Sequence, residues 1–148
     1  AGNPVTGSHG IPVTADRPFA GLMPVDFDGI ALPGGMPGSE NLRNDPAIIS
    51  FVRELHRRGA LVSAICAAPI VLARAGVLAG KRVTCYPGFE DELDGAHVTG
   101  EPVVADSMIV TGRGAGCAIP FAIAIAGILM GEKMRDELKD RLQVYWEL

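Results

Sequence analysis

The sequence has few cysteines, no excess of basic residues and no long uninterrupted apolar run, and each shortage excludes a class of protein. The three cysteines, Cys66, Cys85 and Cys117, are irregularly spaced and form no CxxC pair, so we predict neither a disulfide framework nor a metal site. The 17 acidic residues outnumber the 13 basic ones, which disfavours a nucleic-acid partner. The longest apolar stretch, Ala118 to Met130, contains a proline and a glycine and is too short to span a membrane.

Apolar residues are abundant instead. They make up 48% of the 148 residues, enough for one domain with a buried core, which we expect to be cytoplasmic because the cysteine pattern is typical of a reducing compartment. Strand-like stretches alternate with helical periodicity, which predicts an α/β fold with a mostly parallel sheet and helices on both faces. The predicted strands are 27–32, 61–65, 83–86, 97–99, 103–105 and 108–111, and the predicted helices are 46–58, 67–75, 119–130 and 133–142.

Local patterns refine this order near the start of the chain. Residues 1–14, rich in glycine and proline, predict two short edge strands joined by a turn. Asp45 before Pro46 predicts a capped helix start. Residues 39–44 are predicted to be a polar link, and the apolar strand at 27–32 is predicted to be buried on both faces.

Cys66 lies where a predicted strand passes almost directly into a predicted helix. The strand is Leu61 to Ile65 and the helix follows from Ala67, with Pro69 in its first turn. Unpaired amides and the positive end of the helix dipole would face the thiol and favour its thiolate form. The alternative is a buried structural cysteine, a common environment for this residue.

Ligands of such sheets bind beyond the carboxyl ends of the strands, and two glycine-rich loops follow predicted strands. Gly34 and Gly35 would let backbone amides approach a ligand closely, as an oxyanion hole requires, or they form a plain tight turn. The GRGAGC stretch has Cys117 in place of the third glycine of a dinucleotide fingerprint, so we exclude that site. It could form an anion-binding nest beside Arg113 or only turn into the helix.

No basic partner for Cys66 is evident from the sequence. His9 in the GSHG turn could approach a ligand, although a turn histidine is more often only structural, and His56 and His97 fit surface positions better. Glu40 and Asp16 are available acids that the sequence does not place near the thiol.

Four motifs, ALPGG, AICAAP, VTCYPG and VTGRGAG before an apolar helix, occur here in an order and spacing that resemble the ThiJ/PfpI superfamily, also called the DJ-1/PfpI family. The similarity is greatest to its branch of parkinsonism-associated deglycases and their bacterial relatives. It implies a flavodoxin-like fold of the class I glutamine amidotransferase type, a three-layer sandwich with a doubly wound sheet. It also implies a homodimer whose reactive cysteine is Cys66, with amide donors at Gly35 and Ala67.

The resemblance implies glyoxalase- or deglycase-type activity without a metal or organic cofactor, with sensing of oxidants, chaperone action and peptidase-like hydrolysis as alternatives.

The sequence departs from the family pattern in three places. The family's first strand and helix, which carry a glutamate beside the cysteine, have no match before Ala1, so we expect residues 1–148 to be one domain lacking that unit, or completed by a separate N-terminal chain. Tyr86 replaces a frequent histidine, and His9 replaces an arginine that reaches across the dimer.

The leading hypothesis from the sequence is an enzyme in which Cys66 attacks a small aldehyde such as methylglyoxal, or its adduct on a protein. The amides of Gly35 and Ala67 would stabilise the oxyanion, and a carboxylate outside this chain would move the proton. The second hypothesis is a sensor or chaperone that uses the same cysteine. A glutamine amidotransferase is disfavoured because the chain contains no His-x-Glu tripeptide.

Overall fold

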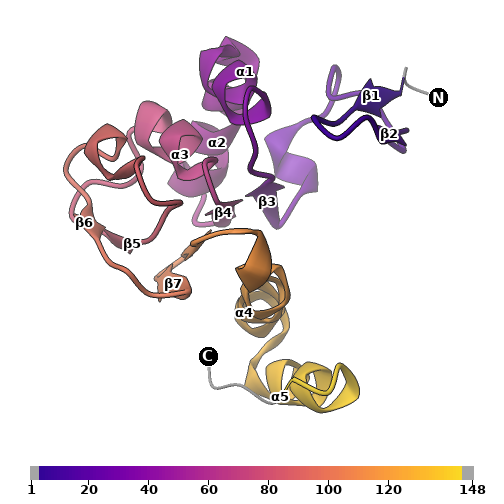
Figure 1. The fold of residues 1–148 in the computed structure, drawn as a ribbon, viewed down its shortest axis with the longest axis vertical. Coiled ribbons are helices and arrows are strands. Elements are labelled where there is room, and N and C mark those ends of the chain that lie inside the picture. Colours follow the sequence, from indigo (N-terminus) through magenta and orange to yellow (C-terminus); the bar gives the residue numbers. More distant parts are fainter. Residues whose placement is uncertain (1–3, 145–148) are drawn as a thin grey trace.

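The central sheet has four strands in the computed structural model, which describes residues 4–144 (Figure 1). Its order is β3 (Gly29–Leu32), β4 (Leu61–Ile65), β8 (Ile109–Gly112) and β7 (Val103–Asp106). The first three strands are parallel and β7 is antiparallel to β8. The predicted α/β fold with a mostly parallel sheet flanked by helices is therefore confirmed.

Two small ribbons complete the strand structure. β1 (Val5–Thr6) and β2 (Pro12–Val13) pair antiparallel, as predicted, in a hairpin that projects from the body (Figure 1). β5 (Arg82–Val83) pairs parallel with β6 (His97–Val98). The strand predicted at 83–86 ends early because the chain turns toward Cys66, whose carbonyl accepts a hydrogen bond from the Tyr86 amide at 2.9 Å.

Helices α1 (Gly38–Asn44), α2 (Pro46–Arg57) and α3 (Pro69–Ala75) pack together on one face of the sheet. Asp45 caps α2 as predicted, its carboxylate accepting from the Ala47 amide at 2.8 Å. The prediction of a polar link at 39–44 is wrong, because these residues form most of α1. Three short 3-10 turns are η1 (Pro24–Asp26), η2 (Glu90–Glu92) and η3 (Ala115–Cys117).

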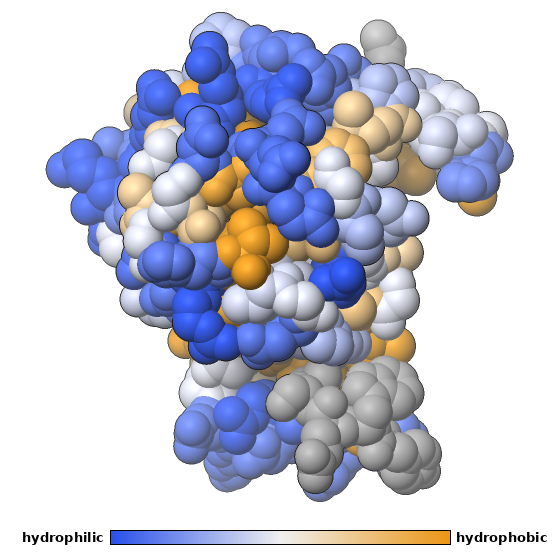
Figure 2. Space-filling model, turned by 60° about the vertical axis from the view of Figure 1, so that its left-hand side comes forward, coloured by the Kyte–Doolittle hydropathy of each residue, from blue (hydrophilic) through white to orange (hydrophobic). Residues whose placement is uncertain are grey.

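The opposite face carries α4 (Ala118–Met130), and α5 (Glu132–Arg141) packs on the outside of α4 (Figure 1). A small cluster of Leu61, Val110 and Phe121 joins α4 to the sheet. None of the helices in residues 4–144 combines the length and apolar character needed to cross a bilayer. On the side that bears β5 and β6, Figure 2 shows a largely hydrophilic surface with a small apolar area near its centre.

The prediction that the strand at 27–32 is buried on both faces is wrong for β3. It lies at the edge of the sheet, Ile30 is half-buried and Ala31 is exposed. Ala31 is two residues beyond Gly29, which pairs with Leu61, so it shares the side of the sheet on which α4 packs. Within residues 4–144, α4 packs on β4, β7 and β8 and leaves this side of β3 open.

Candidate functional site

The predicted strand-to-helix turn at Cys66 is present. β4 ends at Ile65 and α3 begins at Pro69. The half-buried Cys66 has a φ of 65°, in the left-handed region that costs a residue with a side chain about 1–3 kcal/mol. Its amide donates to the Gly112 carbonyl at 2.8 Å, so the end of β8 holds the turn from one side and Tyr86 holds it from the other.

The loop after β3 lies directly against this turn. A methyl group on Gly34 would lie 2.5 Å from Cys66 Cβ, 3.3 Å from Cys66 Sγ and 2.7 Å from the carbonyl oxygen of Ile65, so only glycine fits. The next residue, Gly35, has a φ of 89°, and its carbonyl accepts from the Ser39 amide at 2.9 Å. Within residues 4–144, neither the Gly35 amide nor the Ala67 amide donates to another group.

Tyr86 and His9 differ in where the fold places them. Tyr86 is 50% exposed, and its ring lies 3.6 Å from the position of a methyl group on Gly114, so it flanks the glycine-rich loop after β8. His9 lies in the turn of the projecting hairpin, where its Nδ1 is 3.2 Å from Ser8 Oγ. No hydrogen bond or ion pair within the described residues links His9 to the surroundings of Cys66.

Arg113 lies close to Cys85 and Glu90. Burial raises the pKa of the Cys85 thiol to about 11, and the Glu90 carboxylate raises it while the Arg113 charge lowers it. The Glu90 carboxylate accepts hydrogen bonds from the Glu90 and Gly88 amides, which lower its pKa, and the charge of Arg113 lowers this pKa further. Cys85 is therefore a protonated thiol, and it is buried, whereas the Cys66 residue is only half-buried.

The remaining titratable candidates are dispersed. His56 is half-buried on α2, where its Nδ1 has no hydrogen-bond partner among residues 4–144, and His97 is exposed on β6. Asp16 is exposed, and Cys117 is half-buried just before α4. The described residues contain no group of three or more histidine, cysteine or acidic side chains that could hold a metal ion.

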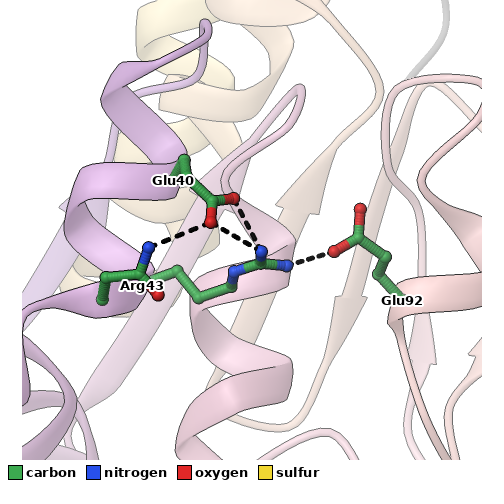
Figure 3. Close-up of polar contacts among 4 residues, drawn as sticks. Glu40, Arg43 and Glu92 are labelled. Carbon is green, nitrogen blue, oxygen red and sulfur yellow. Dashed lines mark hydrogen bonds and ion pairs between the residues drawn. The ribbon is translucent and has the colours of Figure 1, made fainter.

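Glu40 belongs to a polar network that sequence reasoning missed. Arg43 pairs with Glu40 at 2.7 Å and with Glu92, which comes from η2 (Figure 3). The Arg43 hydrogen bond lowers the pKa of Glu40, and the Asn44 side chain adds to this. The spacing of Glu40 and Arg43 by three residues would have indicated a helical pair if 39–44 had been interpreted as a helix.

Proteins with similar sequences are known along most of this chain. Protein dj-1beta of Drosophila melanogaster is 36% identical over 147 residues, which are 97% of this chain and 79% of the fly protein. A protein named deglycase from Pyrococcus horikoshii is 37% identical over 111 residues, 74% of this chain and 66% of that protein. Other relatives are much longer, since the match spans only 36% of Protein DJ-1 homolog A of Arabidopsis thaliana.

The fold comparison gives the same result. The crystal structure of Drosophila melanogaster DJ-1beta superposes with a TM-score of 0.90 at 34% identity, covering 98% of this chain and 79% of the fly chain. The structure of oxidized Toxoplasma gondii DJ-1 gives 0.85 at 30% identity, covering 97% and 79%. The family model named DJ-1/PfpI family matches residues 1–127. The strand-to-helix turn at Cys66 and the adjoining glycine loop agree with these similarities, and the chain belongs to the DJ-1/PfpI family.

Proposed function

We propose that this chain supplies the reacting cysteine of a glyoxalase- or deglycase-type enzyme that acts in the cytoplasm on small aldehydes or their protein adducts. The observation that carries the proposal is the strained turn at Cys66, with Gly34 so close that a methyl group added to it would lie 3.3 Å from Sγ. Backbone strain of this kind concentrates at reactive sites, and the named deglycase among the relatives supports the same chemistry.

The first step joins sulfur to carbon. The Cys66 thiolate attacks the aldehyde carbon, the S–C bond forms, and the π electrons of the carbonyl move onto oxygen. The unpaired amides of Gly35 and Ala67 donate to that oxyanion, and its protonation gives a hemithioacetal. No metal or organic cofactor takes part in this step.

The proton requires an acid, and within residues 4–144 no carboxylate is hydrogen-bonded to Cys66. We propose that a strand and a helix from outside residues 1–148 supply it, arriving on a separate N-terminal chain of the same protein. The open edge of β3 would pair with the strand. Ile119 and Leu129 are exposed on α4, which packs on the same side of the sheet as Ala31, and they would pack against the helix.

The intact mass and N-terminal sequence of the purified protein test this companion segment. We expect a co-purifying segment of strand and helix length with an acidic residue, lost in an Ala31→Arg variant that places a charge on the open side of β3. A preparation containing only residues 1–148 that turns over aldehyde at full rate would contradict it.

We further propose that a second copy of this chain packs on the projecting hairpin. Val5, Ile11 and Val13 are 63–69% exposed there, a concentration of apolar side chains that a homodimer would bury. His9 in the hairpin turn would then lie at the interface and make it pH-sensitive. Sedimentation velocity should give a dimer for the wild type and a monomer for Val13→Asp. An unchanged dimer in the variant would place the interface elsewhere.

Methylglyoxal turnover by the assembled protein tests the enzymatic proposal. We expect the Cys66→Ser variant to lose at least about 100-fold in turnover, since the thiolate is the nucleophile. A Cys117→Ser control should stay active. Full turnover by Cys66→Ser would remove the cysteine mechanism.

The second candidate function, an oxidation sensor or chaperone, rests on the free, only half-buried Cys66 and on an oxidized relative of known structure. Mass spectrometry after mild peroxide distinguishes it. Two oxygen atoms added at Cys66 in a protein with no prior aldehyde turnover would favour sensing over catalysis.

A further inference from the structure

Two separate segments wall the Cys66 turn. The first is residues 34–44, in which Gly34 packs on Cys66 and the Gly35 carbonyl accepts from Ser39, so the glycine loop is tied to the first turn of α1. The second is residues 86–92, in which the Tyr86 amide bonds the Cys66 carbonyl and the chain continues through η2. Both segments therefore touch the turn that carries Cys66, one through Gly34 and the other through Tyr86.

One side chain joins the far ends of these walls. Arg43, in the last turn of α1, contacts Glu40 on its own helix and Glu92 on η2 (Figure 3). Asn44 also donates to Glu40, at 2.9 Å. Within residues 4–144, the contact from Arg43 to Glu92 is the only hydrogen bond or ion pair between residues 34–44 and residues 86–96.

We propose that Arg43 is a positioning residue that fixes the two walls of the Cys66 site through its bridge from Glu40 to Glu92. The inference rests on Cys66 being the reacting group of the proposed function. Glu40, which also accepts a hydrogen bond from Asn44, orients the guanidinium, and Glu92 accepts from it 49 residues further along the chain. A guanidinium suits this role because its planar fork serves two carboxylates at once, which a lysine ammonium on a flexible stem does less well.

The bridge is partly open to solvent, which limits the size of its effect. The Arg43 side chain is 28% exposed and that of Glu92 is 41% exposed. Pairs of this exposure are worth up to about 1 kcal/mol and weaken with salt, so breaking one changes an opening equilibrium by about 2- to 5-fold. The buried Leu93 and the packed Phe89 should keep the second wall folded when the bridge is lost.

The rate at which iodoacetamide alkylates Cys66, followed by peptide mass mapping that separates Cys66 from the half-buried Cys117, measures this opening without using catalysis. The test variant is Glu92→Gln, which leaves Glu40 and Arg43 paired. The control is Glu54→Gln, which removes the same kind of carboxylate from an exposed pair with Arg57 that lies within α2. Arg43→Lys tests whether a planar guanidinium is needed. The double variant Arg43→Gln with Glu92→Gln tests whether the two residues act as a pair.

We expect Glu92→Gln to be alkylated about 2- to 5-fold faster than the wild type, Arg43→Lys to be intermediate, and the double variant to match Glu92→Gln alone. The wild type in 1 M NaCl should approach the variant rate, and methylglyoxal kcat should fall while KM changes little. Equal alkylation rates for Glu92→Gln, Glu54→Gln and the wild type would overturn the proposal. If Glu92→Gln changes the alkylation rate but the wild type shows no aldehyde turnover, the proposed role of Arg43 stands and the proposed enzymatic function is rejected.

Discussion

The two faces of the central sheet differ in how completely the chain covers them. Under α1, α2 and α3, Val62, Leu55 and Leu72 are fully buried in a large continuous core. Under α4 the buried cluster has three members, and most of the apolar side chains of α4 are only partly covered. The first face is therefore closely packed, whereas the second leaves apolar side chains of α4 such as Ile119 and Leu129 exposed.

The largest expected effect comes from truncating the covered face. Leu72→Ala should lower the free energy of unfolding by about 2–5 kcal/mol, because it leaves a cavity in a core with no exposed side. Ile125→Ala, on the partly covered face, should cost about 1 kcal/mol or less. Urea denaturation of both variants measures the difference. Equal losses would show that the two faces are equally packed.

Next in size is an added methyl group where the β3 loop meets Cys66. Gly34→Ala should destabilise the protein by about 1–3 kcal/mol and displace the Cys66 side chain, since the new carbon falls on backbone and side-chain atoms of the turn. Gly38→Ala is the control, because nothing lies within 4 Å of its added carbon. Thermal unfolding and aldehyde turnover are the measurements. A fully active and stable Gly34→Ala variant would refute the close contact.

A smaller difference is expected between the helix starts of the two faces. Asp45→Ala should cost about 1 kcal/mol, because α2 loses the carboxylate that accepts from the Ala47 amide. Glu132→Ala should cost less than about 0.5 kcal/mol, because no side chain caps α5 and the mutated residue is exposed. Chemical denaturation resolves the two values. A larger loss for Glu132→Ala would contradict this order.

The smallest effect is expected on the open side of β3. Ala31→Arg should change the stability of residues 1–148 alone by less than about 0.5 kcal/mol, since the side chain is already in solvent. Denaturation of the isolated chain provides the test. A loss above about 1 kcal/mol would mean that this side of the sheet is covered after all.

Sequence reasoning succeeded where a local signal was strong. Asp45 with Pro46 fixed the start of α2, and the change from β-branched residues to good helix formers placed the turn at Cys66. It failed for α1, because Gly38–Asn44 has almost no apolar periodicity and is supported by the polar contacts of Glu40, Arg43 and Asn44.

Burial and long-range polar contacts could not be inferred from local pattern. The apolar run around Ala31 reads as a buried strand, but its burial depends on which elements lie beside and above it. The Cys66 turn and the glycine loop were found as motifs, whereas the contact from Arg43 to Glu92 joins residues with no shared motif. The site was therefore predictable where it follows strand ends and not where tertiary folding brings surface charges together.

The left-handed backbone at Cys66 also determines which replacements the turn accepts. Glycine adopts this conformation without steric cost, so Cys66→Gly should fold at least as stably as the wild type while leaving a hole where the sulfur was. A small soluble thiol could occupy that hole and react in place of the missing side chain. Restoration of activity by added thiol would separate the contribution of the surrounding scaffold from that of the sulfur itself.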